Sequence, residues 1–475
     1  MSWETVIGLE THVQLSTKTK LFSRASTSFG ASPNTNVNLI DCGLPGVLPS
    51  VNKEAFYKAI RFGMAINAQI NQTSIFDRKN YFYADLPKGY QITQMDLPIV
   101  LGGSIDIYTD ESVKTINITR AHLEEDAGKS IHDEFDGFSA IDLNRAGTPL
   151  LEIVSEPEIS SAKEAVAYMK AMHQLVTYLD VSDGNMAQGS LRCDANVSIR
   201  KRGDKELGTR TEIKNINSFK FIEKAINFEI KRQIKILESG EKVIQETRLY
   251  DSSKDETRPM RSKEFANDYR YFPEPDLLPV IITDEEIQKI KDEFPELPRE
   301  KEARYQSDLG LSAYDSQIIA SSKTIADFFD TAVKKTKNYS LLSNWLIGEI
   351  SAYLNKEQIG INESKLSADK VATLINRIDD QTISGKIGKS IFEEMCLSGA
   401  SPDEIIESKG LKQISDDGAI EDIINDVIKE NPTQVEAYIG GKEKLFGFFV
   451  GQVMKLTQGK ANPKAVNRIL KDKLK

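Results

Sequence analysis

Residues 6–15 read VIGLETHVQL, and polar side chains alternate there with apolar ones at the two-residue period of a β-strand. Glu10, His12 and Gln14 therefore share one face of the predicted strand, while mainly apolar side chains share the other. A carboxylate and an imidazole two residues apart on a rigid strand can hold one divalent cation or one reacting group. The pair of Glu10 and His12 is the first candidate for a chemical site.

Further predicted strands repeat this arrangement of charged and polar side chains. The run 191–200 places Arg192, Asp194, Asn196 and Ser198 on one face, the run 209–214 aligns Arg210, Glu212 and Lys214, and the apolar run 150–154 contains the single carboxylate of Glu152. A polar strand face is most often only solvated. Here several strands carry acids, His, Arg and Asn instead of mainly Lys, Ser and Thr, which favours a polar concavity. Glu152 is the least suited to a simple surface position.

The order of predicted elements indicates several domains. A chain of 475 residues is longer than one hydrophobic core usually organises, so two to four domains are expected. Strand and turn signals dominate up to about residue 279, interrupted by helical patterns at 53–68, 162–178 and 219–238. Prolines at 295 and 298 mark a junction, and helical patterns follow at 321–335, 340–354, 368–379 and 387–395. We predict an α+β protein with a mixed, sheet-rich domain at 1–290, an all-helical domain at 291–402 and a small helical tail domain at 403–475.

Charge and cysteine content narrow the class of protein. The formal net charge of -10 argues against a general nucleic-acid coat protein, which needs a positive field. The three cysteines form no CxxC pair and support neither a disulfide framework nor a structural zinc site. No secretory signal and no apolar run of membrane-spanning length is recognisable. We therefore expect a cytoplasmic protein with no membrane partner.

The C-terminal segment is basic although the chain is acidic. From residue 442 to residue 475 there are nine Lys or Arg and two acids, a net charge of +7. Such a segment is a candidate contact for a phosphate backbone, with Lys455, Lys460 and Lys464 as its expected centre. A solvated helix end explains the same charges equally well.

Two glycine-containing segments resemble phosphate loops but lack the required spacing. Residues 127–130 read AGKS, yet Leu123 stands where the first glycine of the loop is needed, and three acids follow it. Residues 385–390 read GKIGKS, with glycines only three apart. If a nucleotide binds, it binds outside a P-loop, and the acids favour phosphates bridged by Mg2+.

Longer motifs resemble those of a known family. They are GLETHVQL (8–15), DRKNYFY (77–83), HLEEDAGK (122–129), DLNRAGTPLLE (142–152), SLRCDAN (190–196), DYRYFPEPD (268–276), GQVMK (451–455) and ANP (461–463). Together they resemble the B-subunit family of tRNA-dependent glutamyl/aspartyl amidotransferases. The motifs stand in order and span essentially the whole chain.

The resemblance implies a function and partners. In that family an N-terminal cradle domain uses ATP and Mg2+ to phosphorylate the side-chain carboxylate of glutamate on glutamine tRNA or of aspartate on asparagine tRNA. Ammonia from a partner amidase subunit then displaces the phosphate, so the chain would be a subunit of a carbon–nitrogen ligase. A small third subunit completes the implied heterotrimer, and the helical and tail domains would hold the misacylated tRNA. Either tRNA, or both, remains open as the substrate.

The resemblance also implies roles for individual residues. The catalytic set would be Lys79, near the transferring phosphate, with Glu10 and His12. ATP would contact Lys79, Arg192, Asp194 and Asn196, and the metal ligands would be Glu10, His12, Glu124, Glu125, Glu152 and Glu212. Because Glu124 and Glu125 are adjacent, they face opposite ways on a regular strand. Lys79 also has a structural interpretation, as part of a strand whose neighbours Tyr81, Phe82 and Tyr83 are core residues.

The sequence departs from the family pattern in one segment. Some members bind zinc through cysteines near residues 21–26 and near Cys42. Ser23 and Ala25 stand at those positions here, so zinc is not expected and local packing must replace the metal.

Two rival functions remain open. The first is a noncatalytic tRNA-binding or assembly subunit, whose acids would be structural. The second is a metal-dependent hydrolase acting alone, which would leave the basic tail unexplained.

Overall fold

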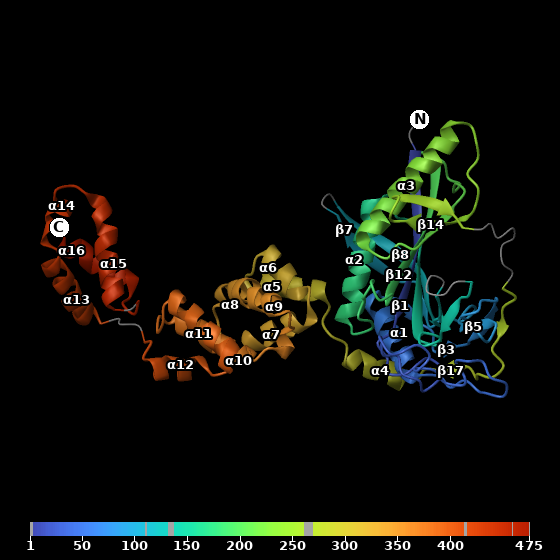
Figure 1. Cartoon of the computed structure of the whole chain (residues 1–475), viewed down its shortest axis with the longest axis horizontal. Helices are drawn as coiled ribbons and strands as arrows, with labels where there is room; N and C mark the ends of the chain where they lie inside the picture. The colour runs from blue at the N-terminus through green and yellow to red at the C-terminus, as the bar shows by residue number, and fades with distance from the viewer. Residues whose placement is uncertain are drawn as a thin grey trace. The chain divides into compact units, whose positions relative to one another are not determined.

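The computed structural model describes residues 3–109, 112–131, 137–260, 269–412, 416–457 and 459–474. Asp268 of the DYRYFPEPD motif and Lys475 of the basic tail lie outside these ranges. The chain divides into two compact units, Met1–Pro295 and Glu296–Lys475. Strands lie in the first unit, and the described part of the second unit is helical (Figure 1). The predicted α+β class is confirmed, while the predicted boundary at residue 402 stays a prediction.

A mixed sheet forms the centre of the first unit (Figure 1). Its neighbouring strands are antiparallel except for one parallel pair, β13 with β14. In order across the sheet they are β15 (Glu256–Pro259), β14 (Thr247–Asp251), β13 (Thr211–Lys214), β12 (Leu191–Lys201), β1 (Trp3–Gln14), β11 (Pro149–Ser155), β8 (Val113–Glu125), β5 (Tyr90–Thr93), β4 (Asp77–Asn80) and β16 (Phe272–Pro273). The shorter strands are β2 (Gln69–Ile70), β3 (Thr73–Ser74), β6 (Val100–Leu101), β7 (Ser104–Tyr108), β9 (Lys129–Ile131), β10 (Ala140–Asp142) and β17 (Val280–Ile281).

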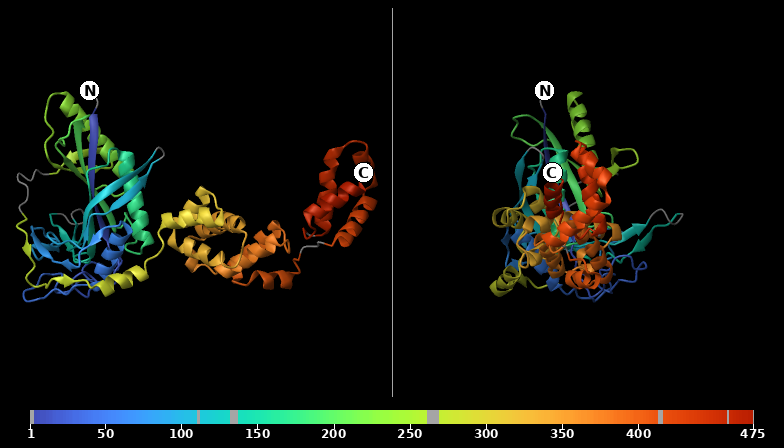
Figure 2. Two further views of the ribbon diagram at one scale, coloured as in Figure 1. Left: turned by 180° about the vertical axis from the view of Figure 1, so that it is seen from behind. Right: turned by 90° about the vertical axis from the view of Figure 1, so that its left-hand side faces the viewer.

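The register of β1 arranges the polar residues of the sheet in rows. Glu10 lies opposite Asp194 of β12, and His12 lies opposite Glu152 of β11. Glu152 in turn lies opposite His122 of β8. Directly opposed residues in antiparallel strands point to the same face. The polar face indicated by the alternation of β1 therefore extends across β12, β1, β11 and β8, and Figure 2 shows the blue β1 running through the sheet beside green strands.

Helices cover the apolar face of the sheet. They are α1 (Lys53–Ala65), α2 (Ala162–Tyr178) and α3 (Phe219–Glu238), and α4 (Asp284–Asp292) packs against α1. The bounds of α2 and α3 are those predicted, whereas α1 ends three residues before the end of the predicted range 53–68. Ser161 and Ser218 begin α2 and α3 by accepting hydrogen bonds from backbone N–H groups of the first turn. Leu9 and Val13 of β1 are fully buried on this side. Burial of the apolar face fixes which side of β1 carries the acids.

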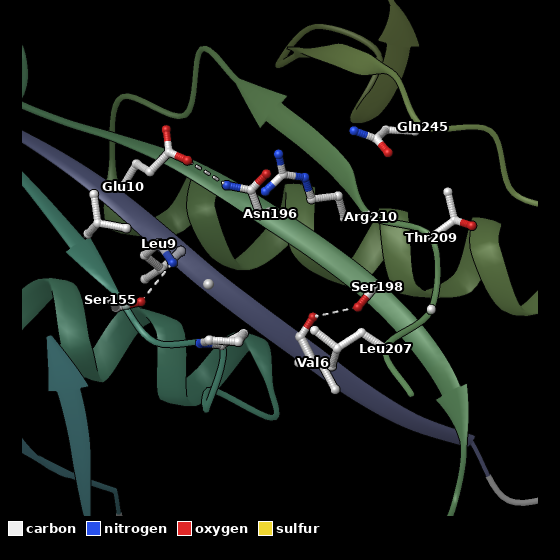
Figure 3. A pocket seen from close by; sticks show the side chains of 14 residues that line it. Val6, Leu9, Glu10, Ser155, Asn196, Ser198, Leu207, Thr209, Arg210 and Gln245 are labelled. Atoms are coloured by element: carbon white, nitrogen blue, oxygen red, sulfur yellow. Dashed lines mark hydrogen bonds between the residues drawn. The ribbon is translucent and has the colours of Figure 1, made fainter. Parts of the chain in front are cut away.

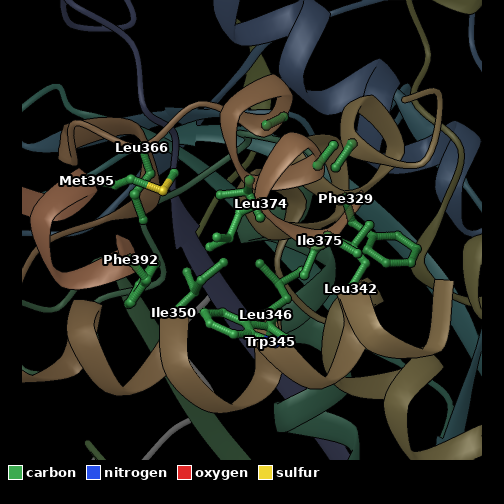
Figure 4. Close-up of a cluster of buried hydrophobic side chains, with 14 of the residues drawn as sticks. Phe329, Leu342, Trp345, Leu346, Ile350, Leu366, Leu374, Ile375, Phe392 and Met395 are labelled. Carbon is green, nitrogen blue, oxygen red and sulfur yellow. The ribbon is translucent and has the colours of Figure 1, made fainter. Parts of the chain in front are cut away.

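The second unit contains two hydrophobic cores. Its helices are α5 (Pro298–Leu309), α6 (Ala313–Ala320), α7 (Lys323–Ala332), α8 (Tyr339–Trp345), α9 (Ser351–Glu357), α10 (Ala368–Asp379), α11 (Gly385–Ser398), α12 (Pro402–Lys409), α13 (Asp417–Glu430), α14 (Pro432–Ile439), α15 (Phe446–Leu456) and α16 (Pro463–Lys473). Trp345, Leu346 and Ile375 belong to the first core (Figure 4), and a second core lies among α13, α15 and α16. The predicted helix at 340–354 is α8 and α9 joined by a π-helical turn, Leu346–Ile350. No helix in the described ranges is long and apolar enough to cross a membrane.

Phe329→Ala should destabilise the first of these helical cores. Phe329 is fully buried, and its ring packs edge-on against that of Tyr305 with centroids 5.1 Å apart. Removing a buried Phe side chain costs about 3–5 kcal/mol of unfolding free energy. In a Trp3→Phe background, Trp345 of the same core is the single remaining tryptophan and its fluorescence reports unfolding by urea. The control Leu397→Ala removes an exposed side chain and should change stability by less than about 0.5 kcal/mol. Equal stability of the two variants would contradict the packing described.

Candidate active site

The first acid group lies on β1, β11 and β8 and is called here the His12 group. It consists of His12, Glu124 and Glu152, whose ligand atoms all lie within 4.8 Å of one another. His12 Nε2 is 3.5 Å from a Glu152 carboxylate oxygen. His122 lies alongside, with its Nε2 atom 3.6 Å from Glu152 and 3.7 Å from Glu124. The strand register therefore gathers two imidazoles and two carboxylates in one place.

Burial and the neighbouring charges shift the pKa values in and beside the His12 group in opposite directions. Burial alone would lower the pKa of His12, but the hydrogen bond and charge of Glu152 outweigh it and raise this pKa to about 9. Burial likewise opposes ionisation of Glu152, but the imidazoles of His122 and His12 hold its pKa well below the usual range. Burial would also lower the pKa of Lys79, yet the nearby carboxylates of Glu124 and Glu152 outweigh the effect of burial and raise this pKa. Lys79 is therefore a cation beside this group.

The second acid group lies on β1, β12 and β13 and is called here the Glu10 group. Its members are Glu10, Asp194 and Glu212, again with ligand atoms within 4.8 Å of one another. Lys214 Nζ lies 2.5 Å from Asp194 and 2.8 Å from Glu212, which compensates part of the negative charge. Glu10 accepts a hydrogen bond from the Asn196 side chain at 3.0 Å. Burial and then the neighbouring carboxylates raise the pKa of Glu10.

Both groups fit a divalent cation by the chemistry of their donors. The Glu10 group offers carboxylate oxygens, the donors that Mg2+ prefers in proteins. The His12 group combines an imidazole with carboxylates, a set that also suits transition metals. Neither group contains a cysteine.

The two adjacent glutamates at the end of β8 have different environments. Glu124 belongs to the His12 group. Glu125 instead forms an ion pair with Lys88 and accepts a hydrogen bond from the backbone N–H of Ile92 at 2.9 Å. Their opposite directions follow from the regular pleat of the strand. The structure does not bring Glu125 into either acid group.

The residues predicted to contact ATP are divided between different surroundings. Arg192 is held by Asp126 through a hydrogen bond of 2.8 Å, and Gln14 donates to the same carboxylate at 2.8 Å. Burial raises the pKa of Asp126, but the guanidinium groups of Arg192 and Arg145 outweigh this and lower it. The four residues predicted to contact ATP are Lys79, Arg192, Asp194 and Asn196. Of these, Asn196 alone lines the cavity beside the Glu10 group.

That cavity has a volume of about 390 Å³ and lies between β1, β12 and the segment that leads into β13 (Figure 3). Glu10 and Asn196, joined by their hydrogen bond, lie toward one end, while Val6, Ser198 and Leu207 gather toward the other. The lining also includes Pro157, Thr209, Arg210 and Gln245. A cavity of this size with an apolar end and a polar end suits a small organic ligand that carries charged groups.

Sequence reasoning missed several of these residues. His122 lies two positions before Glu124 on the same strand, and this spacing was the available signal for placing it on the polar face. Leu207 and Gln245 lie in irregular segments, where no periodicity reveals the direction of a side chain. The interpretation of Phe82 as a core residue was wrong, because 79% of it is exposed.

The segment that contains Ser23 and Cys42 includes a buried ion pair. Lys20 Nζ lies 3.0 Å from Asp41 Oδ2, and the Ser23 hydroxyl donates to the same oxygen at 3.1 Å. Lys20 is fully buried. Removing one partner of such a pair leaves an uncompensated buried charge. The pair therefore holds the segment around Lys20 against the segment around Asp41. Cys42 follows Asp41 directly in the sequence.

The basic residues of the tail differ in their partners. Lys455 lies exposed in α15, Lys464 lies exposed in α16, and Lys460 lies in the connection between these helices. In the described ranges no carboxylate lies within 4.0 Å of these three amino groups. Arg468 and Lys473 of α16, by contrast, form ion pairs with acids of α13. The three lysines are therefore available to an anionic ligand.

Two family models match the chain. The one described as the GatB/GatE catalytic domain matches residues 5–288, and the one described as the GatB domain matches residues 327–474. The first match contains both acid groups, Lys79 and the cavity, and the second contains most of the helical unit.

Curated relatives match over the full length. The B subunit of the aspartyl/glutamyl-tRNA(Asn/Gln) amidotransferase of Hydrogenovibrio crunogenus is 61% identical over 476 residues, and the corresponding chains of Azotobacter vinelandii and Ectopseudomonas mendocina are 58% and 59% identical over 480 and 479 residues. Each match covers 100% of both chains. The family resemblance of the sequence motifs is thus confirmed, and the chain belongs to the family of aspartyl/glutamyl-tRNA amidotransferase B subunits.

Proposed function

We propose that the chain uses ATP to activate the side-chain carboxylate of Glu-tRNA(Gln), of Asp-tRNA(Asn) or of both, and then forms the amide with ammonia. As a member of its family, it is a subunit of a ligase that forms carbon–nitrogen bonds. The main support is the pair of acid groups on one face of a rigid sheet, with Lys79 beside one group and a cavity beside the other. A noncatalytic binding subunit has no need of this concentration of charge and is not favoured.

The proposed reaction has two steps. The side-chain carboxylate of the aminoacyl group attacks the terminal phosphorus of ATP, ADP leaves, and an acyl phosphate forms. Ammonia then attacks the carbonyl carbon, inorganic phosphate leaves, and the nitrogen loses a proton to give the amide. Phosphoryl transfer depends on positioning and on neutralising the charge of the transferring group. Lys79, a cation beside Glu124 and Glu152, is suited to the second task.

The acid groups would hold Mg2+. Glu10, Asp194 and Glu212 supply the oxygen-rich set, and the His12 group supplies a further position. Mg2+ held by these residues would neutralise part of the charge of the phosphates. The strands contribute rigidity, because Glu10 and His12 are fixed on β1 by hydrogen-bonded neighbours on both sides.

The cavity beside the Glu10 group would bind the nucleoside of ATP. Its end with Val6 and Leu207 suits a base, and the end with Glu10 directs the phosphates toward the acid groups. Arg210 at the lining can pair with a phosphate oxygen. Asn196, which lines the cavity and contacts Glu10, would link the nucleotide to the metal site.

The proposed partners follow from the reaction. An amidase subunit would supply the ammonia, a small third subunit would complete a heterotrimer, and the basic tail would contact the misacylated tRNA. Because aminoacyl-tRNA is used in the cytoplasm, we place the protein there.

Glu152→Gln should reduce transamidation at least about 100-fold, because it removes a charge from the His12 group without changing side-chain size. ATP consumption is measured with misacylated tRNA and ammonium chloride in the assembled enzyme, together with tRNA affinity, which should not change. Glu156→Gln, just beyond the same strand, should stay within about twofold of wild type because Glu156 lies outside both acid groups. Wild-type turnover of Glu152→Gln would refute the site, and rapid ATP hydrolysis without tRNA would favour the hydrolase.

Gly208→Ala should weaken ATP binding. A Cβ atom at position 208 would lie 2.1 Å from the carbonyl oxygen of Ile199, so the segment that carries Leu207 and Thr209 must move away from β12. We expect KM for ATP to rise about tenfold, which corresponds to about 1.4 kcal/mol, with KM for tRNA unchanged. The control Gly385→Ala meets nothing within 4 Å and should leave both constants unchanged. An unaltered KM for ATP in Gly208→Ala would place the nucleotide elsewhere.

Replacing Lys455, Lys460 and Lys464 together with alanine should weaken tRNA binding and flatten its salt dependence. Each lost phosphate contact lowers the slope of log affinity against log salt by up to about one unit. Binding is measured across a salt series in the full-length protein. The matched control is Arg468→Ala with Lys473→Ala, which should change the slope less because these cations are already paired with acids. An unchanged slope for the triple variant would mean that the tail is a packing module.

A further inference from the structure

Residues 269–276 form a strap along β4, although they follow it by about 190 positions in sequence. Phe272 and Pro273 of β16 pair antiparallel with Arg78 and Asp77 of β4. The backbone N–H of Glu274 then donates to the carbonyl of Phe76 at 2.8 Å. The strap thus closes the edge of the sheet beside Lys79, which is the next residue of β4 after Arg78.

An ion pair fastens the C-terminal end of the strap. Arg78 donates two hydrogen bonds to the carboxylate of Glu274, at 2.7 and 2.8 Å. The Glu274 side chain is 1% exposed, and the Arg78 guanidinium lies over the ring of Tyr90 at 4.1 Å. A bidentate pair of this kind fixes the relative orientation of the two side chains as well as the distance between them. This end of the strap is therefore held in a single arrangement.

Asn80 holds the N-terminal end of the strap. Its backbone N–H donates to the carbonyl of Tyr269 at 3.0 Å, and its side-chain amide donates to the carbonyls of Tyr269 and Arg270 at 3.1 and 2.9 Å. Arg270 has a φ of 45°, in the left-handed region that residues other than glycine seldom adopt. Such strain persists only where the surroundings impose it, and it gathers at functional sites. The Asn80 side chain holds the carbonyls of Tyr269 and Arg270, one on each side of this strained position.

The Tyr269 ring, at the start of this turn, packs edge-on against the rings of Tyr81 and Tyr271. Lys79 Nζ lies over that ring, 5.0 Å from its centroid. Glu124 and Glu152 act on the lysine electrostatically, but no described carboxylate lies within 4.0 Å of its ammonium group. A cation over an aromatic face is attracted to it and loses freedom of movement. The ring is thus a contact that limits where the ammonium group can lie.

We propose that the strap and Asn80 are positioning elements of the amidotransferase reaction, which hold the Tyr269 ring against Lys79 so that its ammonium group stays at the transferring phosphate. Asn80 and Glu274 do not touch the reacting atoms in this scheme and act through Tyr269. The inference rests on the proposed function, because it assumes that Lys79 serves phosphoryl transfer.

The first test compares two substitutions of Tyr269 in the enzyme assembled with its partner subunits. Tyr269→Leu removes the ring, and kcat should fall at least about tenfold, since small displacements of a catalytic group are costly. KM for ATP and for tRNA should stay within about twofold, because neither the cavity nor the tail is changed. Tyr269→Phe keeps the ring and should retain kcat within about twofold. A kcat of Tyr269→Leu near wild type, or equal losses in both variants, would overturn the proposal.

The second test asks whether Asn80 acts through the ring. Asn80→Ala should lower kcat, and the double variant with Tyr269→Leu should lose little more than the larger single loss, because both remove the same restraint. Losses that multiply would show that Asn80 acts independently and would overturn the proposal. Lys79→Gln separates this result from the proposed function. If Lys79→Gln is inactive while Tyr269→Leu is active, the strap proposal fails alone, whereas wild-type activity of Lys79→Gln contradicts the proposed function itself.

Discussion

The position of β1 between two antiparallel neighbours is the constraint on which the candidate site depends. Glu10 and His12 meet Asp194 and Glu152 only because β12 and β11 pair with β1 in one register. A slip of a single residue would turn every acid of β1 toward the helices. The fully buried Leu9 excludes that slip, since it would have to face water. Apolar packing beneath the sheet therefore determines the geometry of the charged face above it.

That geometry concentrates like charges, and the two acid groups compensate them differently. The His12 group contains one imidazole and has a second, from His122, alongside it. The Glu10 group depends on Lys214, which contacts Asp194 and Glu212 but leaves Glu10 with a raised pKa. Repulsion between carboxylates opposes folding, and the rigid strands hold them together despite it. The two acid groups thus differ in how their negative charge is balanced.

Periodicity predicted which residues share a face, but not which faces meet. The alternation of 6–15 and 191–200 correctly separated polar from apolar sides, and the helical ranges of the first unit were close to α1, α2 and α3. The alternation did not predict which partner each side chain contacts. Arg192 shares the face of Asp194, yet its guanidinium binds Asp126. The alternation did not predict the strap either, because no local signal connects residue 274 with residue 78. The family resemblance supplied Lys79 and Glu124, which spacing alone would not have selected.

The pairing of β1 also has a consequence for synthesis on the ribosome. β1 is the first strand to emerge, but Gln14 pairs with Leu150 and Trp3 with Lys201. At roughly 5–20 residues per second, the edge of β1 that meets β11 remains without a partner for about seven to thirty seconds, and the edge that meets β12 for about ten to forty seconds. An unpaired strand with an apolar face is prone to association with other nascent chains, and charged residues within it suppress this. Glu10 and His12 would therefore protect the nascent strand against association before its partners are made.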